Sequence, residues 1–397
     1  MSPPFFTVIV PTRDRAGTLP HSVRSILAQR FGDLEAIVVD NCSAPPAAES
    51  LAGLDDPRLR ILTAPRRLAM HDNWEFGLSQ ARGRHVMFIG DDDAVMPDGL
   101  ELAARVLRDN AAEVLAWPRH DYKWPDSTLY PGLMIVRQGD RLGAYDGAAH
   151  LAALFAWRQQ SRFVTSIYHG LVSADLIARI RQAQGGRYFA DPVCDIESEM
   201  LNAYYASRIL ACERPLTMNG HSGASNGGAN GEAAAIRAAH SRFAAEAGLA
   251  EADLVPYGWD FPLYMPTMVA GCQARVKARH FPQDDRFAPD RAALLQYLAN
   301  TYFVFGEAAF DDLTARLRRI AVAQGIDPGS VKLPPPDRRK VEMSFATGIR
   351  PGEDGRHSVV IDSRKAGIDT ISKAVQLADA MMPAIPEVAN PPPAGPT

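Results

Sequence analysis

The stretch from residue 85 to residue 100, HVMFIGDDDAVMPDGL, decides the expected fold. Val86 to Ile89 is a short apolar run and predicts a buried strand. Gly90 and three consecutive acids, Asp91, Asp92 and Asp93, follow it directly. Neighbouring carboxylates repel one another, so the cluster is costly unless a cation or solvent relieves it. Ligands of open α/β sheets bind beyond the carboxyl ends of strands, which predicts a binding site here. An acidic surface turn, with Asp98 capping the next helix, is the alternative.

Further apolar runs lie before this strand, at residues 5–10, 34–39 and 58–63. Helical spacing of apolar residues separates them and continues after them, at residues 17–30, 70–81 and 97–110. Strands that alternate with helices in this way are typical of parallel sheets with helices on both faces. The fold class predicted from this pattern is therefore α/β, with a doubly wound and mostly parallel sheet.

Composition sets limits on the kind of partner. The chain has 397 residues, of which 47% are hydrophobic and 22% charged, and its net charge is −4. No overall basic field attracts nucleic acid, so we expect no nucleic-acid partner. The four cysteines form no C-x-x-C pair, and no run reaches the ~18 apolar residues of a transmembrane segment. Without signal-peptide features at residues 1–4, we expect a cytoplasmic protein, either free or peripheral at the inner face of the membrane.

The turn after the first strand excludes two common ways of binding phosphate. It reads Pro11-Thr12-Arg13-Asp14-Arg15, and the first glycine is Gly17. A dinucleotide-binding fingerprint or a P-loop requires a glycine-rich turn at such a position. Phosphates would instead be bound by a metal ion on the acidic cluster and by arginine side chains. Oxygen ligands of this kind suit Mg²⁺ or Mn²⁺.

Four short motifs, taken in order, resemble the nucleotide-binding half of inverting family 2 glycosyltransferases, which have the GT-A fold. They are VIVPTR at 8–13, IVVDNCS at 37–43, Asn73 with ARGR at 81–84, and GDDD…MPDGL at 90–100. The resemblance covers residues 5 to about 110. It implies that the GT-A domain ends near residue 231 and binds a nucleotide-diphosphate sugar. The residues it places against this donor are Pro11, Thr12, Arg13, Arg15, Asp40, Asn41, Arg67, Asn73, Asp91 and Asp92.

The resemblance also implies a metal site and a preference for the base. Asp92 best matches the metal-binding acid, with Asp91 facing the ribose or sugar and Asp93 as a further ligand. Many members have a second acid where this chain has Asn41, whose amide oxygen can still accept a hydrogen bond from a pyrimidine N–H. We therefore expect Mn²⁺ or Mg²⁺ as cofactor and a UDP- or dTDP-sugar as donor. Arg67 could equally be a solvated loop arginine.

The catalytic base is expected in the run YFADPVCDIESE at 188–199. An inverting transfer needs one carboxylate to deprotonate the acceptor hydroxyl, and the family places it at the start of a helix in this region. Asp195 is the chosen base and Asp191 the reserve. Asp191 is predicted to cap this helix, with Pro192 at its first position. Two ordinary acids at a helix start remain the alternative.

The rest of the chain offers weaker signals. Trp117, His120, Tyr122 and Trp124 could form a wall against a sugar or a small core cluster. Five glycines between residues 219 and 231 predict a mobile loop that closes over the donor, where His221 could complete the metal shell. Residues 232–382 are predicted to be a mainly helical region that docks the acceptor, forms a homo-oligomer or covers the core, and 383–397 a proline-rich disordered tail.

The function predicted is a metal-dependent inverting glycosyltransferase that acts on a hydroxyl of a glycan, glycolipid or glycoprotein in surface polysaccharide or glycoconjugate biosynthesis. A sugar-phosphate nucleotidyltransferase is the first alternative, but it would need a glycine-rich loop after the first strand. The second is a non-catalytic sugar- or nucleotide-binding module. The three adjacent acids argue against the second alternative without excluding it.

Overall fold

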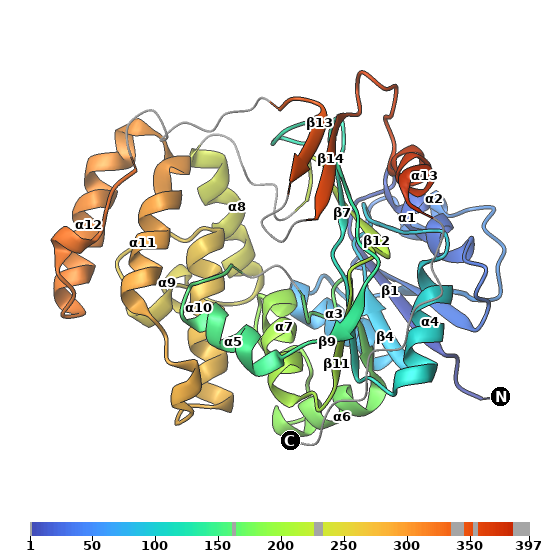
Figure 1. Cartoon of the computed structure of the whole chain (residues 1–397), viewed down its shortest axis with the longest axis horizontal. Helices are drawn as coiled ribbons and strands as arrows, with labels where there is room; N and C mark the ends of the chain where they lie inside the picture. Colours follow the sequence, from blue (N-terminus) through green and yellow to red (C-terminus); the bar gives the residue numbers. More distant parts are fainter. Residues whose placement is uncertain (1, 161–163, 226–232, 335–344, 352–355, 384–397) are drawn as a thin grey trace.

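The computed structural model describes residues 2–160, 164–225, 233–334, 345–351 and 356–383. Two β-sheets occupy one part of the molecule, and a group of helices lies beside them (Figure 1). The larger sheet has the strand order β3-β2-β1-β4-β10-β6-β11-β9. Its strands are β1 (Phe6–Thr12), β2 (Leu34–Asp40), β3 (Leu59–Thr63), β4 (His85–Phe88), β6 (Val114–Ala116), β9 (Leu142–Ala144), β10 (Leu171–Ser173) and β11 (Ile209–Cys212).

The first half of this sheet is parallel, because β1 pairs in parallel with both β2 and β4, and β2 with β3. β10 is antiparallel to β4 and β6, whereas β11 is parallel to β6. Thr12 and Asp40 are partners in the register of β1 and β2, so both strands end at one edge. This arrangement confirms the α/β, GT-A fold class expected from the sequence, and it confirms each of the four expected strands.

Helices cover both faces of the sheet. Alternate residues of a strand point to opposite faces. Ile9, Ile37 and Val39 belong to one core cluster with α3 and α7, whereas Val8 and Val38 belong to another with α1 and α4. The helices of this part are α1 (Leu19–Leu27), α2 (Ala47–Ser50), α3 (Met70–Ser79), α4 (Gly99–Asn110), α5 (Gly147–Phe155), α6 (Ala174–Ala183) and α7 (Cys194–Tyr205).

The second sheet includes strands from near the end of the chain. Its order is β13-β14-β8-β7-β12-β5. The strands are β5 (Ala94–Val95), β7 (His120–Lys123), β8 (Leu133–Arg137), β12 (Thr217–His221), β13 (Gly348–Pro351) and β14 (His357–Asp362). Helix α13 (Ile371–Met381) packs on it through Ile371, Ala374 and Ala378. β13, β14 and α13 therefore return to the part of the chain that forms the sheets, and Figure 1 shows α13 in red beside α1.

The remaining helices extend one core rather than forming a second. They are α8 (Ala233–Glu246), α9 (Glu251–Leu254), α10 (Met265–His280), α11 (Arg291–Thr301) and α12 (Phe310–Ala323). Short 3₁₀ helices join them, at Pro256–Gly258, Asp285–Phe287, Tyr302–Phe305, Glu307–Ala309 and Pro328–Ser330. Leu254, Met268 and Val276 share a buried cluster with Ile196 and Met200 of α7. The mainly helical C-terminal region is thus confirmed, and it packs directly on α7.

Some local predictions were wrong. The glycine-rich stretch at 219–231 was expected to be a loop throughout. The glycine-rich stretch begins as strand β12, which runs to His221, and residues 226–232 lie outside the described part of the chain. The predicted lid therefore stays a prediction. Asp98 occupies the N-cap position of α4 without a capping hydrogen bond from its side chain.

Candidate active site

The three consecutive acids follow β4 at the edge where β1 and β2 also end, and each has different partners. Asp91 accepts a hydrogen bond from the Thr12 hydroxyl at 2.7 Å through Oδ2. The Nε atom of Arg15 lies 3.8 Å from Oδ1 of Asp91. Burial raises the pKa of Asp91 to about 7, while the charge of Arg15 opposes the rise. The turn after β1 and the acidic cluster therefore form one surface, as the sequence predicted.

Asp92 is bound by the segment that follows β12. Its Oδ2 accepts hydrogen bonds from the Ser222 amide at 3.1 Å, the Ser222 hydroxyl at 2.7 Å and the Ser225 hydroxyl at 2.5 Å. Arg15 donates to the Ser222 hydroxyl at 2.6 Å. An added Cβ at Gly220 would lie 1.7 Å from the backbone oxygen of Asp92, so only glycine allows this approach. One glycine of the stretch thus has a packing role.

Asp93 has the most partners and is fully buried. Its Oδ2 accepts hydrogen bonds from the Tyr168 hydroxyl at 2.7 Å and the Gly90 amide at 2.5 Å, and Nε2 of His169 lies 3.0 Å away. Its Oδ1 accepts from the Gly220 amide at 2.7 Å. Although burial alone would raise the pKa of Asp93, these partners keep it below its ordinary value. Asp93 therefore has a structural partner on each oxygen.

The site offers few protein ligands to a divalent ion. Across the described residues, no three His, Cys, Asp or Glu side chains are grouped to hold a metal ion. The expected joint set of Asp91, Asp92, Asp93 and His221 is therefore not formed. Asp93 is saturated, and Nδ1 of His221 lies 3.3 Å from the Ser127 hydroxyl. Within the described chain, the hydrogen bonds to the Asp92 carboxylate all end on Oδ2, which leaves Oδ1 for a ligand. Mg²⁺ often binds through one carboxylate, waters and substrate phosphates.

Other residues expected to contact the nucleotide have structural partners. Asp40 accepts hydrogen bonds from the Ser43 and Ala47 amides, so it orders the loop after β2. Both amide atoms of Asn41 pair with the backbone of Leu68, at 2.8 and 2.9 Å. The amide oxygen expected to accept from a pyrimidine N–H thus already accepts one hydrogen bond, and its contact with a base stays a prediction.

The remaining donor-side residues differ in how they are held. Pro11 lies within β1, and Asn73 is buried on α3. Arg13 donates to Glu246 of α8 at 3.2 Å, which brings the C-terminal helices to the turn after β1. Arg67 pairs with Asp14 at 3.2 Å and is exposed. These residues border the site, and their nucleotide contacts stay predictions.

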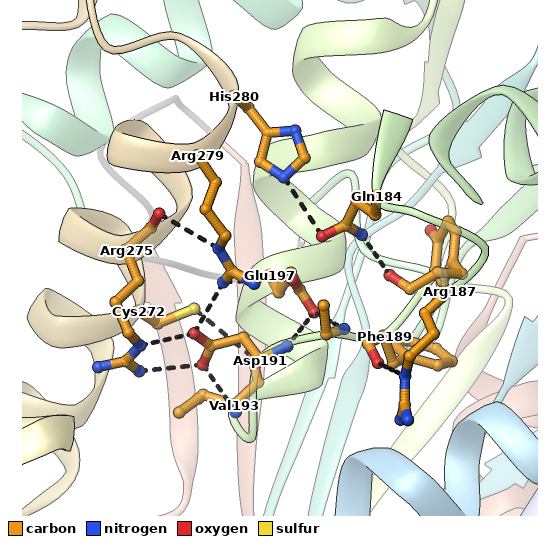
Figure 2. Close-up of polar contacts among 12 residues, drawn as sticks. Gln184, Arg187, Phe189, Asp191, Val193, Glu197, Cys272, Arg275, Arg279 and His280 are labelled. Atoms are coloured by element: carbon orange, nitrogen blue, oxygen red, sulfur yellow. Dashed lines mark hydrogen bonds and ion pairs between the residues drawn. The ribbon is translucent and has the colours of Figure 1, made fainter. Parts of the chain in front are cut away.

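The helix expected after Asp191 begins later than predicted. α7 starts at Cys194 with Val193 as its N-cap, so Asp191 is not the capping residue and Pro192 is not at the first helical position. The buried Asp191 carboxylate instead forms ion pairs with Arg275 at 2.7 Å and Arg279 at 3.1 Å (Figure 2). These arginines lower the pKa of Asp191 against the opposing effect of burial. A carboxylate bound in this way is a poor base, because its lowered pKa makes it slow to take a proton.

Asp195 lies in the first turn of α7 with few partners. Its Oδ1 accepts a hydrogen bond from the Ile196 amide at 2.9 Å. None of the ion pairs among the described residues includes it. Burial raises the pKa of Asp195 to about 6, with a further rise from Glu199 and an opposing effect from Arg119. A carboxylate with a pKa near the working pH suits a general base.

One short segment connects the two acidic regions. The Ser166 hydroxyl donates to the backbone oxygen of Asp195 at 2.9 Å, while Tyr168 and His169 contact Asp93. Ser166 and Tyr168 are two residues apart, a span of at most about 7 Å. His169 adopts a left-handed backbone with φ of 60°, which a non-glycine residue tolerates only where its surroundings impose it. The proposed base thus lies near the donor-side acids.

Sequence reasoning missed several residues of this site. Ser222 and Ser225, which bind Asp92, and Tyr168, which binds Asp93, carry no motif of their own. Arg119 acts electrostatically on both Tyr168 and Asp195. The aromatic residues after β6 proved to be core rather than a sugar wall, since Trp117, Tyr122 and Trp124 are buried. Trp124 donates to the backbone oxygen of Asp92 at 3.1 Å.

Comparison with known proteins gives one family. Residues 7–158 match the model described as Glycosyl transferase family 2. The chain is 34% identical over 97 residues to the succinoglycan biosynthesis protein ExoO of Rhizobium meliloti. The aligned segment is 24% of this chain and 28% of that protein. The chain is also 33% identical over 114 residues to the GalNAc(5)-diNAcBac-PP-undecaprenol beta-1,3-glucosyltransferase of Campylobacter jejuni. That alignment covers 28% of this chain and 37% of the relative. The chain thus matches less than two fifths of the length of these curated relatives.

Among solved structures, S. aureus TarS 1-349 in complex with UDP-GlcNAc aligns over 83% of this chain and 89% of that one. The identity is 16% and the TM-score 0.46. In the part of the chain that the structure describes, no helix combines the length and the apolar character needed to cross a bilayer.

Proposed function

Because residues 7–158 belong to glycosyltransferase family 2, we propose that this chain transfers a sugar from a nucleotide-diphosphate sugar to a hydroxyl group of an acceptor, with inversion at the anomeric carbon. One observation carries the proposal. A partly buried acid without an ion-pair partner in the described chain, Asp195, is joined through Ser166–His169 to the acids at the end of β4.

The donor would bind at the edge formed by β1, β2 and β4. Arg15 contacts both Asp91 and the Ser222 hydroxyl, which supports a role for its guanidinium in binding the diphosphate. A guanidinium matches the geometry of phosphate oxygens. Asp92 would hold Mn²⁺ or Mg²⁺ through Oδ1, and a divalent ion bound there supplies charge that stabilises the leaving diphosphate. Asp93 would act indirectly, by fixing Gly220 and the cluster.

The acceptor hydroxyl would be activated by Asp195. With a pKa raised to about 6, Asp195 is deprotonated at neutral pH and can still take a proton with useful driving force. As the hydroxyl oxygen bonds to the anomeric carbon, its proton passes to the Asp195 carboxylate and the bond to the diphosphate breaks. Asp191 does not compete for this role, because two arginines bind it.

The names of the relatives suggest the class of acceptor. One concerns succinoglycan biosynthesis, and another an undecaprenol-linked oligosaccharide. We therefore propose a glycan, glycolipid or glycoprotein acceptor in the biosynthesis of a polysaccharide or glycoconjugate. The UDP or dTDP preference, the cytoplasmic location and a homo-oligomer through the C-terminal helices stay predictions.

A donor screen tests the proposal. Release of nucleoside diphosphate is measured across UDP-, dTDP- and GDP-sugars with Mn²⁺, with Mg²⁺ and with EDTA. We expect slow hydrolysis of one donor class that depends on the metal. Tight binding without any turnover would favour the non-catalytic binding module. Formation of a nucleotide sugar from a nucleoside triphosphate and a sugar phosphate would favour the nucleotidyltransferase.

A further inference from the structure

Three side chains on one face of α10 contact the segment just before the proposed base. They are Cys272, Arg275 and Arg279, spaced by three and four residues, which places them on one side of a helix. Their partners lie in residues 190–197, at the start of α7 (Figure 2). α10 belongs to the helical C-terminal region, which the sequence left without a chemical role.

The contacts on Asp191 are bidentate. Arg275 places Nε 2.7 Å from Oδ2 and Nη2 3.0 Å from Oδ1 of Asp191, while its Nη1 donates to the Asp253 backbone oxygen at 2.8 Å. Arg279 adds a contact to Oδ2 at 3.1 Å. Asp191 in turn accepts from the Val193 amide at 3.1 Å. The carboxylate therefore fixes the chain before α7 to the helix behind it.

A second buried acid completes the cluster. Oε2 of Glu197 accepts hydrogen bonds from the Ala190 and Asp191 amides, both at 2.8 Å, and Oε1 lies 3.5 Å from Arg279. Cys272 of α10 contacts the same turn, with its sulfur 3.7 Å from the Val193 backbone oxygen. Two acids and two arginines thus surround the turn that leads into Cys194 and Asp195.

The direction of the Asp195 side chain depends on this turn. Its carboxylate is bound by the neighbouring Ile196 amide, and its backbone oxygen by the Ser166 hydroxyl from the opposite side. Since no ion pair among the described residues aims the carboxylate, its position follows that of the backbone. The backbone here is held between the turn before β10, through Ser166, and α10, through Asp191.

We propose that Arg275 and Arg279 are positioning residues, through which the C-terminal helices set the placement of Asp195 against the acceptor hydroxyl. The inference rests on the proposed function, because it assigns these arginines to the same transfer. A positioning role differs from a purely structural role in one measurable result. A variant that folds but has a loosened turn should lose turnover while its donor binding is unchanged.

The experiment compares Arg275→Met, Arg275→Lys and Arg316→Met with the wild-type chain. Arg316 is the matched control, since its side chain is 33% exposed against 27% for Arg275, and its partners Asp260 and Asp312 both lie in the C-terminal region, away from α7. Lysine keeps the charge of Arg275 but cannot bridge both oxygens of Asp191. kcat and KM are measured with the donor identified by the screen, together with the affinity for its nucleoside diphosphate.

For Arg275→Met we expect a fall in kcat of about 10²-fold, the size associated with a misplaced catalytic group. Arg275→Lys should recover part of this loss, and Arg316→Met should match the wild type within twofold. All variants should bind the nucleoside diphosphate with wild-type affinity within twofold. If Arg275→Met does not fold, Asp191→Asn combined with Arg275→Met removes the unpaired buried charge, and the same fall in kcat is expected.

A folded Arg275 variant, single or double, with kcat within threefold of the wild type would overturn the inference. So would equal losses of kcat and of nucleoside diphosphate affinity, because they would indicate general loosening of the fold. Absence of transfer by the wild type and by Arg316→Met would instead overturn the proposed function, and the inference with it. The two failures are therefore distinguished by the wild-type and control rates.

Discussion

The acids at residues 91–93 are buried, as are Asp191 and Glu197, whereas Asp195 is partly buried, and different groups offset the charge of the two clusters. At the first cluster, hydroxyl and amide groups bind Asp92, and His169 accompanies Asp93. At the second, arginines from α10 bind Asp191 and Glu197, whereas no ion pair within the described ranges includes Asp195. Because its donors are neutral, Asp92 keeps a negative charge that can bind a cation. Asp195 can take a proton because none of the described arginines of α10 pairs with it. Adjacent acids in one sequence run can thus have separate roles.

The largest effect should come from replacing each of the two candidate bases, Asp195 and Asp191, by asparagine. Asp195→Asn keeps the size of the side chain but removes its ability to take a proton, so transfer should fall about 10²–10⁴-fold. Asp191→Asn should lower stability by about 3–5 kcal/mol, because it breaks a buried ion pair, and should lower transfer by no more than the ~10²-fold expected for Arg275→Met. Initial rates and thermal unfolding of both variants check this. Full activity in Asp195→Asn with none in a folded Asp191→Asn would reverse the roles.

The next largest effect should separate Asp93 from Asp92. Asp93→Asn removes the partner of buried His169 and should cost about 3–5 kcal/mol of unfolding free energy. Asp92→Asn should cost no more than about 1.5 kcal/mol, since its Oδ2 contacts are ordinary hydrogen bonds. Denaturant unfolding gives both values. Equal losses would mean that the two acids are not specialised as described.

The pH dependence of transfer should show the state of Asp195. The base works when deprotonated, so activity is present above its pKa and is lost as the pH falls through about 6. Well below that value, kcat/KM should drop about tenfold per pH unit. Arg119→Met should move this limb to higher pH, because the positive charge of Arg119 lowers the pKa of Asp195. An acid limb that stays near pH 4 in both proteins would contradict the assignment.

The smallest effect is expected at the segment that covers Asp92. Ser225→Ala removes one of the hydrogen bonds to Oδ2, while Ser222 still donates from its amide and hydroxyl. The change should alter nucleoside diphosphate affinity by no more than about tenfold, in line with about 0.5–1.5 kcal/mol for one hydrogen bond. Calorimetric titration measures it. Complete loss of binding would mean that Ser225 contacts the ligand itself.

Local patterns were enough to predict the sheet but not the partners of its acids. The apolar runs of β1, β2 and β4 are buried on both faces, so each stands out in the sequence. The separate roles of the acids depend on residues far along the chain. Tyr168 is 75 positions from Asp93, and Ser222 is 130 positions from Asp92.

The same limit explains the error at the second cluster. Asp191 before Pro192 has the local pattern of a helix start, and nothing nearby signals otherwise. The helix begins at Cys194 because Arg275, 84 positions away, binds the Asp191 carboxylate. A buried ion pair across this separation outweighs a capping hydrogen bond, which is worth about 1 kcal/mol. The place of Asp195 in the first turn of a helix could be predicted from the local pattern, and its role as the base stays a prediction.

Asp92 is proposed to bind the metal and the diphosphate, whereas Asp195 is proposed to act only on the acceptor. This assignment is tested most directly by one binding experiment on both variants, with and without metal. A nucleoside diphosphate is titrated calorimetrically into Asp92→Asn and Asp195→Asn, each with Mn²⁺ and with EDTA, using the base that the donor screen identifies. The account predicts that Asp195→Asn binds with wild-type affinity and wild-type metal dependence. It predicts that Asp92→Asn loses the gain in affinity that Mn²⁺ provides. Equal affinity of Asp92→Asn and the wild type in Mn²⁺, or loss of binding by Asp195→Asn, would contradict it.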